Sequence, residues 1–245
     1  MSSNFDFVVL ISADAEWEVV KRYFKDYTIY DHPYGQWLLH KYTFSPQLTN
    51  PVIFVHGGWG KVAAAGSTQF AIGRWHPKLI VNLGTCGGFE GEIDIGENIL
   101  VEETIIYDIY EKMGDPKEPI KHYVTKIDNS WIGEAPPIEV HRTRLVSADR
   151  DLGYEELAGL KSGYGAIAGD WESGAIAWVA SKNETPCLIL RGVTDLVGEN
   201  YGQVYDGNVG LYYQNTETIM RILLDSLPAW LLKFIDNYIK ANLKK

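Results

Sequence analysis

Two acidic motifs in the last third of the chain have the residue types and spacing of a ligand site. Glu172 directly precedes 173–177, a run of small and apolar residues that is typical of a helix. Asp195 closes an apolar run that begins at Cys187 and is typical of a buried strand. Open α/β sheets bind their ligands at the carboxyl ends of strands. We therefore expect Glu172 and Asp195 to belong to one active site.

A third acid follows the first strand of the chain. The apolar run 7–11 predicts a buried strand, and the spacing of apolar residues over 13–24 predicts a helix. Glu16 lies in the first turn of that helix, and Glu18 is the rival acid two residues later. An acid in a first turn can also simply compensate the helix dipole, which is an alternative for Glu16 and for Glu172. Asp195 could instead cap a following helix.

The elements that must position these acids alternate between strands and helices. Further strands are predicted at 52–56, 79–83 and 98–105. The pattern also predicts a hairpin around Pro33-Tyr34-Gly35 and a glycine-rich turn at 84–88. Helices are predicted at 60–75 and 212–227, and another helix starts at Pro228. This alternation predicts an α/β fold: one domain, 1–245, built as a three-layer α/β/α sandwich around a mixed, mostly parallel sheet.

Composition excludes several classes of protein. The chain has 245 residues, of which 46% are hydrophobic, so it can bury a large core. Its net charge is −10 and its basic residues are scattered, which disfavours nucleic acid and anionic membranes as partners. Two cysteines, Cys86 and Cys187, form neither a disulfide framework nor a metal motif, and the six histidines lack metal-ligand spacing. We expect no metal, no cofactor and a cytoplasmic location, since the first residues do not resemble a signal peptide.

Four separated motifs carry a resemblance to a known family. They are Ile11 to Glu16, the helix start Gly60-Lys61-Val62-Ala63-Ala64-Ala65, the segment Asn82-Leu83-Gly84-Thr85-Cys86-Gly87-Gly88, and the two acidic motifs. In this order they resemble the nucleoside phosphorylase and nucleosidase superfamily, most closely its 5′-methylthioadenosine/S-adenosylhomocysteine nucleosidase branch. The resemblance implies an N-glycosidase that hydrolyses a purine nucleoside into free base and ribose moiety.

The resemblance also assigns roles to the acids. Members of the family cleave the bond through a transition state with positive charge on the ribose ring, and the purine leaves more readily when it is protonated. Asp195 resembles the proton donor, and burial at a strand end could raise its pKa as that role requires. Glu172 resembles the carboxylate that binds the ribose hydroxyls. Glu16 resembles the base that activates water.

Other positions match the family's substrate contacts. Thr85 takes the place of a small hydroxyl residue beside the water, and Arg191 that of a buried residue orienting a carboxylate. The remaining candidates for substrate contact are Cys86, Gly87, Thr194, Tyr205 and Trp171. Each also has a structural explanation, such as a turn, core packing or an internal ion pair.

Two departures from the family pattern concern the substrate. Asp170-Trp171-Glu172 replaces the usual Glu-Met-Glu, so a large indole stands where a methionine faces the ribose. After Ser147-Ala148-Asp149, where the nucleosidases commonly place an aromatic residue against adenine, this chain has Arg150-Asp151-Leu152. The base and the 5′ substituent therefore stay open.

The first strand end decides between water and phosphate as nucleophile. Phosphorolytic relatives have Gly-Asp-Pro-x-Arg there, whereas this chain has Ser12-Ala13-Asp14-Ala15-Glu16, whose acids would repel phosphate. Hydrolysis is therefore favoured, and a phosphorylase using Lys61 or a partner's arginine is the alternative. A nucleoside-binding domain without catalysis is a second alternative. By analogy with the family we expect a homodimer or a higher homo-oligomer.

Overall fold

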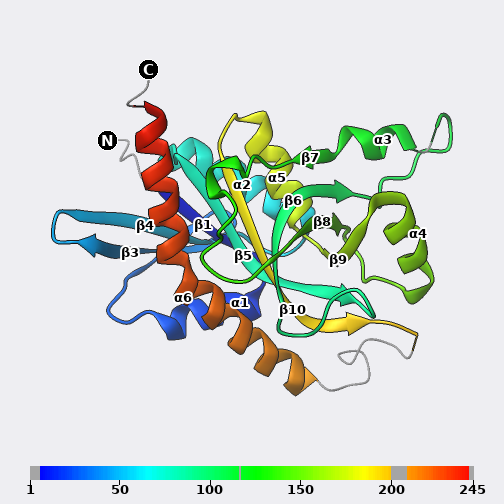
Figure 1. The fold of residues 1–245 in the computed structure, drawn as a ribbon, viewed down its shortest axis with the longest axis horizontal. Coiled ribbons are helices and arrows are strands. Elements are labelled where there is room, and N and C mark those ends of the chain that lie inside the picture. The colour runs from blue at the N-terminus through cyan, green and yellow to red at the C-terminus, as the bar shows by residue number, and fades with distance from the viewer. Residues whose placement is uncertain (1–5, 116, 200–208, 243–245) are drawn as a thin grey trace.

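The computed structural model describes residues 6–115, 117–199 and 209–242 (Figure 1). The strands are β1 (Phe7–Ile11), β2 (Ile29–His32), β3 (Gly35–Ser45), β4 (Leu48–His56), β5 (Leu79–Phe89), β6 (Asn98–Ile106), β7 (Val124–Lys126), β8 (His141–Ser147), β9 (Ala166–Asp170) and β10 (Cys187–Val197). The helices are α1 (Asp14–Tyr23), α2 (Gly60–Trp75), α3 (Lys117–His122), α4 (Tyr154–Tyr164), α5 (Ser173–Lys182) and α6 (Val209–Asn242), with a 3₁₀ turn, η1 (Ser130–Ile132).

One mixed sheet joins the strands in the order β10-β6-β8-β9-β5-β1-β4-β3-β2, with β7 beside β6. Its centre is parallel, because β1 pairs in parallel with β4 and β5, and β5 pairs in parallel with β10. The predicted hairpin is present as β2 and β3, which pair antiparallel through a turn at Pro33 and Tyr34. The predicted α/β fold with a mixed sheet is confirmed.

The strands beyond β1 do not form a simple open sheet. Because β5 pairs with β9 as well as with β10, the strands β10, β6, β8, β9 and β5 close into a ring. The segment 84–88, predicted to be a turn, instead continues β5 and pairs with β10 and β9. Gly88 shows how the segment fits: a Cβ there would come within 2.7 Å of Ile93 and 2.8 Å of Val193, so a side chain would clash with these neighbours.

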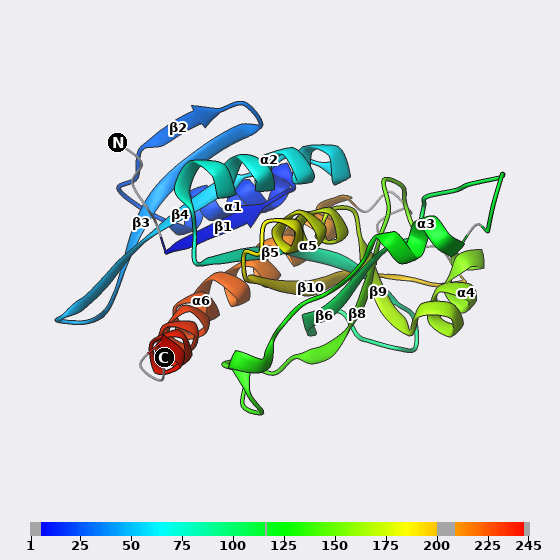
Figure 2. The ribbon, with the colours of Figure 1, turned by 90° about the horizontal axis from the view of Figure 1, so that it is seen from above.

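Helices cover both faces of the sheet, as the sandwich requires. Alternate residues of β1 divide between two cores, with Phe7 and Val9 packing against α1 and α6, and Val8 and Leu10 packing against α2 and α5. Helices α2 and α5 lie side by side over their face (Figure 2). Both faces of β1 are therefore buried, and its carboxyl end, which leads into α1, lies in the interior of the protein.

The end of the chain differs from the prediction. Pro228 was expected to start a new helix, but it lies inside α6, which continues to Asn242. A proline inside a helix costs about 3 kcal/mol through a lost hydrogen bond and a clash. The residues on both sides of it, Leu227, Trp230 and Leu231, are buried in the core, and burial of each such side chain contributes roughly 1.5–3 kcal/mol. Packing along one continuous helix therefore outweighs the local preference of proline.

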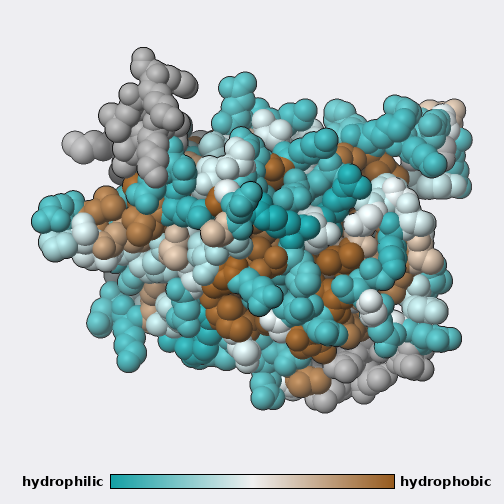
Figure 3. Space-filling view, in the orientation of Figure 1, coloured by the Kyte–Doolittle hydropathy of each residue, from teal (hydrophilic) through white to brown (hydrophobic). Residues whose placement is uncertain are grey.

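The surface facing the viewer in Figure 3 is mainly hydrophilic, and apolar side chains reach it in separate areas. Among the described residues, no helix has both the length and the apolar composition that crossing a membrane requires.

Candidate active site

A cavity of about 340 Å³ lies where the ends of β1, β5, β9 and β10 meet. Its lining includes most of the residues that the sequence singled out, namely Glu16, Thr85, Cys86, Gly87, Trp171, Glu172, Thr194 and Asp195. Arg191 lies beneath the lining and is 1% exposed. Tyr205, also predicted as a contact, lies outside the described residues. The three acids that the chemistry requires therefore converge on one hollow.

A larger hollow, of about 650 Å³, lies at the edge formed by β6 and β8. Its arginines are paired with its acids, since Arg142 bridges to Glu102 at 3.5 Å and Arg144 to Glu103 at 2.9 Å. It holds none of the predicted catalytic residues, so we place the active site in the smaller cavity.

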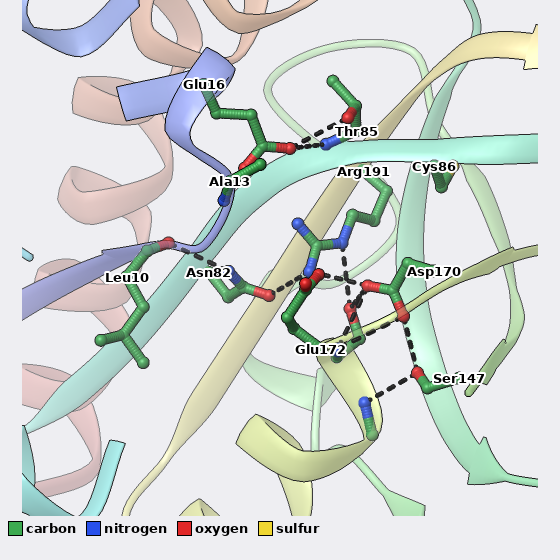
Figure 4. Close-up of polar contacts among 12 residues, drawn as sticks. Leu10, Ala13, Glu16, Asn82, Thr85, Cys86, Ser147, Asp170, Glu172 and Arg191 are labelled. Atoms are coloured by element: carbon green, nitrogen blue, oxygen red, sulfur yellow. Dashed lines mark hydrogen bonds and ion pairs between the residues drawn. The ribbon is translucent and has the colours of Figure 1, made fainter. Parts of the chain in front are cut away.

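Glu16 is fixed against the middle of β5, at Thr85. Its carboxylate accepts hydrogen bonds from the Thr85 amide at 2.6 Å, the Thr85 hydroxyl at 2.9 Å and the Ala13 amide at 3.2 Å (Figure 4). Burial raises the pKa of Glu16, and the positive charge of Arg191 partly offsets that effect. Glu18, the rival in the sequence, points to solvent and pairs with Lys21 at 2.5 Å. The geometry therefore favours Glu16 as the acid of the site.

Glu172 stands at the entrance of α5 but does not cap it. Its side chain makes no hydrogen bond to the first turn and instead accepts one from the Gly60 amide, at the start of α2, at 3.0 Å. Burial, together with the negative charge of Asp170, raises the pKa of Glu172 to about 8. A carboxylate that only compensated the helix dipole would not need a partner from another helix. Its position on the cavity wall fits contact with a ligand.

Arg191 is a buried cation close to Asp170, Glu16 and Glu172 (Figure 4). It pairs with Asp170 at 2.7 Å and donates to Asn82 at 2.6 Å and to the Ser173 hydroxyl at 3.0 Å. Its pairing partner is thus Asp170, the first acid of the Asp-Trp-Glu motif. Asp170 is held in turn by the Ser147 hydroxyl at 2.6 Å. This network fixes the start of α5, and with it Glu172.

Asp195 lines the cavity from β10. It lies within β10, which continues to Val197, so it does not cap a following helix. The Thr194 hydroxyl donates to its carboxylate at 2.8 Å. Burial raises the pKa of Asp195, the Thr194 hydrogen bond lowers it, and the charge of Asp151 raises it further. A carboxyl group in these surroundings gives up its proton less readily than an exposed aspartate does.

Cys86 lines the cavity but lacks the features of a nucleophile. Its thiol is buried and lies 3.7 Å from the Gly192 carbonyl. Burial raises its pKa well above the usual range, which keeps the thiol protonated. Among the described residues, no group of three histidine, cysteine or acidic side chains is placed to hold a metal ion.

Comparison with known proteins identifies the family of the chain. The family model described as the phosphorylase superfamily matches residues 7–227. The chain belongs to this superfamily. A 5′-methylthioadenosine/S-adenosylhomocysteine nucleosidase of Buchnera aphidicola is 26% identical over 190 residues, which is 73% of this chain and 82% of the relative. The predicted resemblance is thereby confirmed.

Solved structures of the superfamily share the fold. The 5′-methylthioadenosine/S-adenosyl homocysteine nucleosidase of Campylobacter jejuni superposes with a TM-score of 0.72 at 18% identity, covering 91% of this chain and 99% of that one. A putative nucleosidase of the same kind from Borrelia burgdorferi, bound to adenine, gives 0.71 at 21% identity, with 91% and 99% covered.

Several residues of this superfamily member escaped the sequence analysis. Asp170 was noted only as a departure from the family motif, and its pairing with Arg191 joins positions 21 residues apart. Tyr212 of α6 lines the cavity near Glu16, where burial and the charge of Glu16 raise its pKa to about 12. Trp59 also lines the cavity, just before α2. Nothing in the local sequence marks Tyr212 or Trp59, because tertiary packing brings them to the site.

Proposed function

We propose that the chain hydrolyses the N-glycosidic bond of a purine nucleoside of the 5′-methylthioadenosine or S-adenosylhomocysteine type, releasing the free base and the ribose moiety. The observation that carries this proposal is the convergence of Glu16, Glu172 and Asp195 on one cavity. The names of its relatives in the phosphorylase superfamily support the same activity.

Asp195 is the proton donor in this proposal. A purine leaves as an anion unless a proton reaches it, and a positioned acid contributes about 10²–10⁴-fold to such a step. Burial raises the pKa of Asp195, which favours its protonated form, and Thr194 fixes its orientation through their hydrogen bond. Cys86 and Gly87, on β5 beside Asp195 on β10, offer main-chain groups to the base.

Glu16 and Thr85 activate the attacking water. Thr85 donates its hydroxyl to Glu16 at 2.9 Å, so a water that binds to both would lie against the carboxylate. The raised pKa of Glu16 makes it a stronger base than an exposed glutamate. It takes a proton from the water as the water attacks the anomeric carbon opposite the leaving base, in an inverting displacement.

Glu172 binds the ribose hydroxyls. With a pKa of about 8, Glu172 is largely protonated near neutral pH. Two hydroxyl donors and the positive charge that develops on the ring both favour its ionised form. Its charge is therefore stabilised most strongly in the transition state, which is the condition for catalysis by differential binding.

Water is favoured over phosphate because the site offers little positive charge. The Lys61 ammonium is bound to Asp108 and lies 3.9 Å from Asp149. Among the described residues that line the cavity, the one exposed cation is Arg150, which pairs with Glu156. An anionic nucleophile would instead meet the carboxylates of the lining.

The test is base release from a panel of purine nucleosides, including 5′-methylthioadenosine and S-adenosylhomocysteine, with and without added phosphate. We expect release without phosphate, a loss of at least about 100-fold for Asp195→Asn, and a comparable loss for Glu16→Gln. Glu18→Gln is the matched control, because this acid is two residues away and faces solvent. Thermal melting checks that each variant is folded.

The same experiment separates the alternatives. Strict dependence on phosphate would assign the chain to the phosphorylases. Calorimetric binding of a nucleoside without release of its base would assign it to nucleoside-binding domains. Equal activity of the Asp195→Asn variant and the unmodified protein would refute the role of this acid.

We also infer that the protein forms a homo-oligomer and works in the cytoplasm. Both cysteines are buried free thiols, which fits a reducing compartment. The relevant measurements are light scattering for the mass in solution and cell fractionation for the location.

A further inference from the structure

The first turn of α6 supplies a tyrosine to the cavity. Tyr212 is the α6 residue in the described lining, which takes Glu16, Thr85 and Asp195 from three other elements. Burial is the largest cause of the raised pKa of Tyr212, the charges of Glu16 and Asp195 add to it, and hydrogen bonding with the Thr85 hydroxyl lowers it. The phenol of Tyr212 therefore lies close to both acids and beside Thr85.

Contacts between α6 and β10 fix the place of this tyrosine. One turn after Tyr212, the side-chain amide of Asn215 donates to the Thr194 carbonyl at 2.7 Å. One turn further, Ile219 is buried against Gly192, where a Cβ would come within 2.3 Å of it. Residues three or four apart share one face of a helix, so Tyr212 belongs to the face that packs on β10.

The Thr85 hydroxyl has a single proton, and the Glu16 carboxylate accepts it. The two oxygens are 2.9 Å apart, and Glu16 in its role as a base is ionised, so it can only accept. The Thr85 oxygen is then left as an acceptor, and the phenol of Tyr212 is the donor beside it. The phenol oxygen keeps its own lone pairs as acceptors on the cavity side.

An attacking water must be oriented as well as deprotonated. It carries two protons, and one of its lone pairs must point at the anomeric carbon. Glu16 accepts the first proton, and an acceptor for the second proton sets the direction of that lone pair. The phenol oxygen of Tyr212 is such an acceptor. Hydrogen bonds then run from the water to Tyr212, on to Thr85 and on to Glu16, and consecutive hydrogen bonds polarise one another.

We propose that Tyr212 is a further catalytic residue, whose phenol oxygen accepts the second proton of the attacking water in a hydrogen bond and so directs that water at the anomeric carbon. The proposal rests on the function proposed above and names a residue that holds its nucleophile. The water gives one proton to Glu16 and keeps the other in the new anomeric hydroxyl. The glycosidic bond breaks as the bond to the water oxygen forms, and its electron pair leaves with the base, which takes the proton of Asp195. Tyr212 keeps its own proton.

The experiment measures kcat and KM for base release in Tyr212→Phe, with the purine nucleoside that is cleaved fastest. This variant keeps the ring and loses only the hydroxyl. We expect kcat to fall about tenfold, the effect of one hydrogen bond to the reacting water. KM should change less than about twofold, because the hydroxyl does not hold the substrate. Tyr213→Phe is the matched control, since Tyr213 is 57% exposed and lies outside the described lining.

A double-mutant cycle separates this role from a structural one. Thr85→Ala removes the acceptor that orients the phenol, so in that background Tyr212→Phe should lower kcat less than about threefold. Equal losses in the two backgrounds would overturn the proposal. A Tyr212→Phe variant with the kcat of the unmodified protein would also overturn it, because the tyrosine would then act only through its ring.

Failure of the proposed function is a separate outcome, namely no base release from any nucleoside. In that case NMR of protein labelled with ¹³C at the tyrosine Cζ decides the inference, with the Tyr212 signal assigned by its absence in Tyr212→Phe. A shift of this signal as Glu16 titrates, abolished in Thr85→Ala, supports the hydrogen-bonded path from the phenol to Glu16. A shift that is absent, or that is unchanged in Thr85→Ala, overturns it.

Discussion

Gly84 is the position at which the active site is most sensitive to a single methyl group. It lies in β5, and a Cβ there would be 1.8 Å from the Arg191 guanidinium and 2.8 Å from the Glu16 carboxylate. The guanidinium has little freedom to move, because Asp170, Asn82 and Ser173 hold it. The substitution Gly84→Ala therefore forces Arg191 out of its network or displaces β5.

The expected loss of stability follows from the interactions that the displacement breaks. Overpacking a tight interior by one methyl group costs about 1–3 kcal/mol. Separating Arg191 from Asp170 leaves a buried charge without its partner, and loss of one member of such a pair costs about 3–5 kcal/mol. Since the clash is with the guanidinium itself, we expect Gly84→Ala to lower the free energy of unfolding by about 3–5 kcal/mol. That is a large part of the about 5–15 kcal/mol typical of a domain.

Urea unfolding followed by tryptophan fluorescence measures this change. Gly159→Ala is the matched control, because Gly159 lies inside α4 and no atom beyond its chain neighbours and the helix's own backbone lies within 4 Å of its Cβ position. We expect that variant to gain about 0.5–1 kcal/mol, since alanine favours a helix over glycine. A Gly84→Ala variant within about 1 kcal/mol of the unmodified protein would show that the arginine network is not rigid.

Two further predictions concern charge. Burial is the main cause of the raised pKa of Asp195, and the charge of Asp151 adds to it. The substitution Asp151→Asn should therefore lower the pKa of Asp195 and move the alkaline limb of the pH profile of kcat to lower pH. An unchanged alkaline limb would contradict the coupling between the two acids. In the fold the pKa of Glu172 is about 8, against an ordinary value of 4.5. The folded state therefore binds more protons than the unfolded state between these two pH values, and the free energy of unfolding falls as the pH rises through them. The substitution Glu172→Gln removes this loss of stability at high pH. The melting temperature of the variant should therefore exceed that of the unmodified protein by more at about pH 8 than at about pH 5. A constant difference between the two melting temperatures would show that Glu172 does not titrate in this range.

The elements with strong local patterns were predictable from the sequence. The apolar run at β1 and the alanine-rich pattern at α2 gave the observed bounds, because a buried strand and a packed helix each require their own periodicity. The glycines of 84–88 were misleading, since the same lack of a side chain that permits a turn also permits close packing inside a strand. Their role depends on Ile93 and Val193, which the local sequence does not place.

The candidate site likewise contains residues that the sequence could predict and residues that it could not. Glu16, Glu172 and Asp195 could be named because each acid adjoins a strand or helix end in a motif of the superfamily. The pairing of Arg191 with Asp170 could not be predicted, because it depends on β10 and β9 reaching the same interior point across the ring. The place of Trp59 in the cavity lining could not be predicted from the sequence either, since its contact with Trp171 joins the start of α2 to the start of α5.

The buried charges of the site are unbalanced in a way that suits the proposed reaction. Arg191 is one cation beneath Asp170, Glu16 and Glu172, and its pairing with Asp170 leaves the other two acids without a full counter-charge. Burial then raises the pKa of both Glu16 and Glu172. A ribose ring with developing positive charge would supply the missing cation at the moment of bond cleavage. The expected gain in stability of Glu172→Gln should therefore be accompanied by a loss of activity, because the same uncompensated carboxylate that weakens the fold stabilises the transition state.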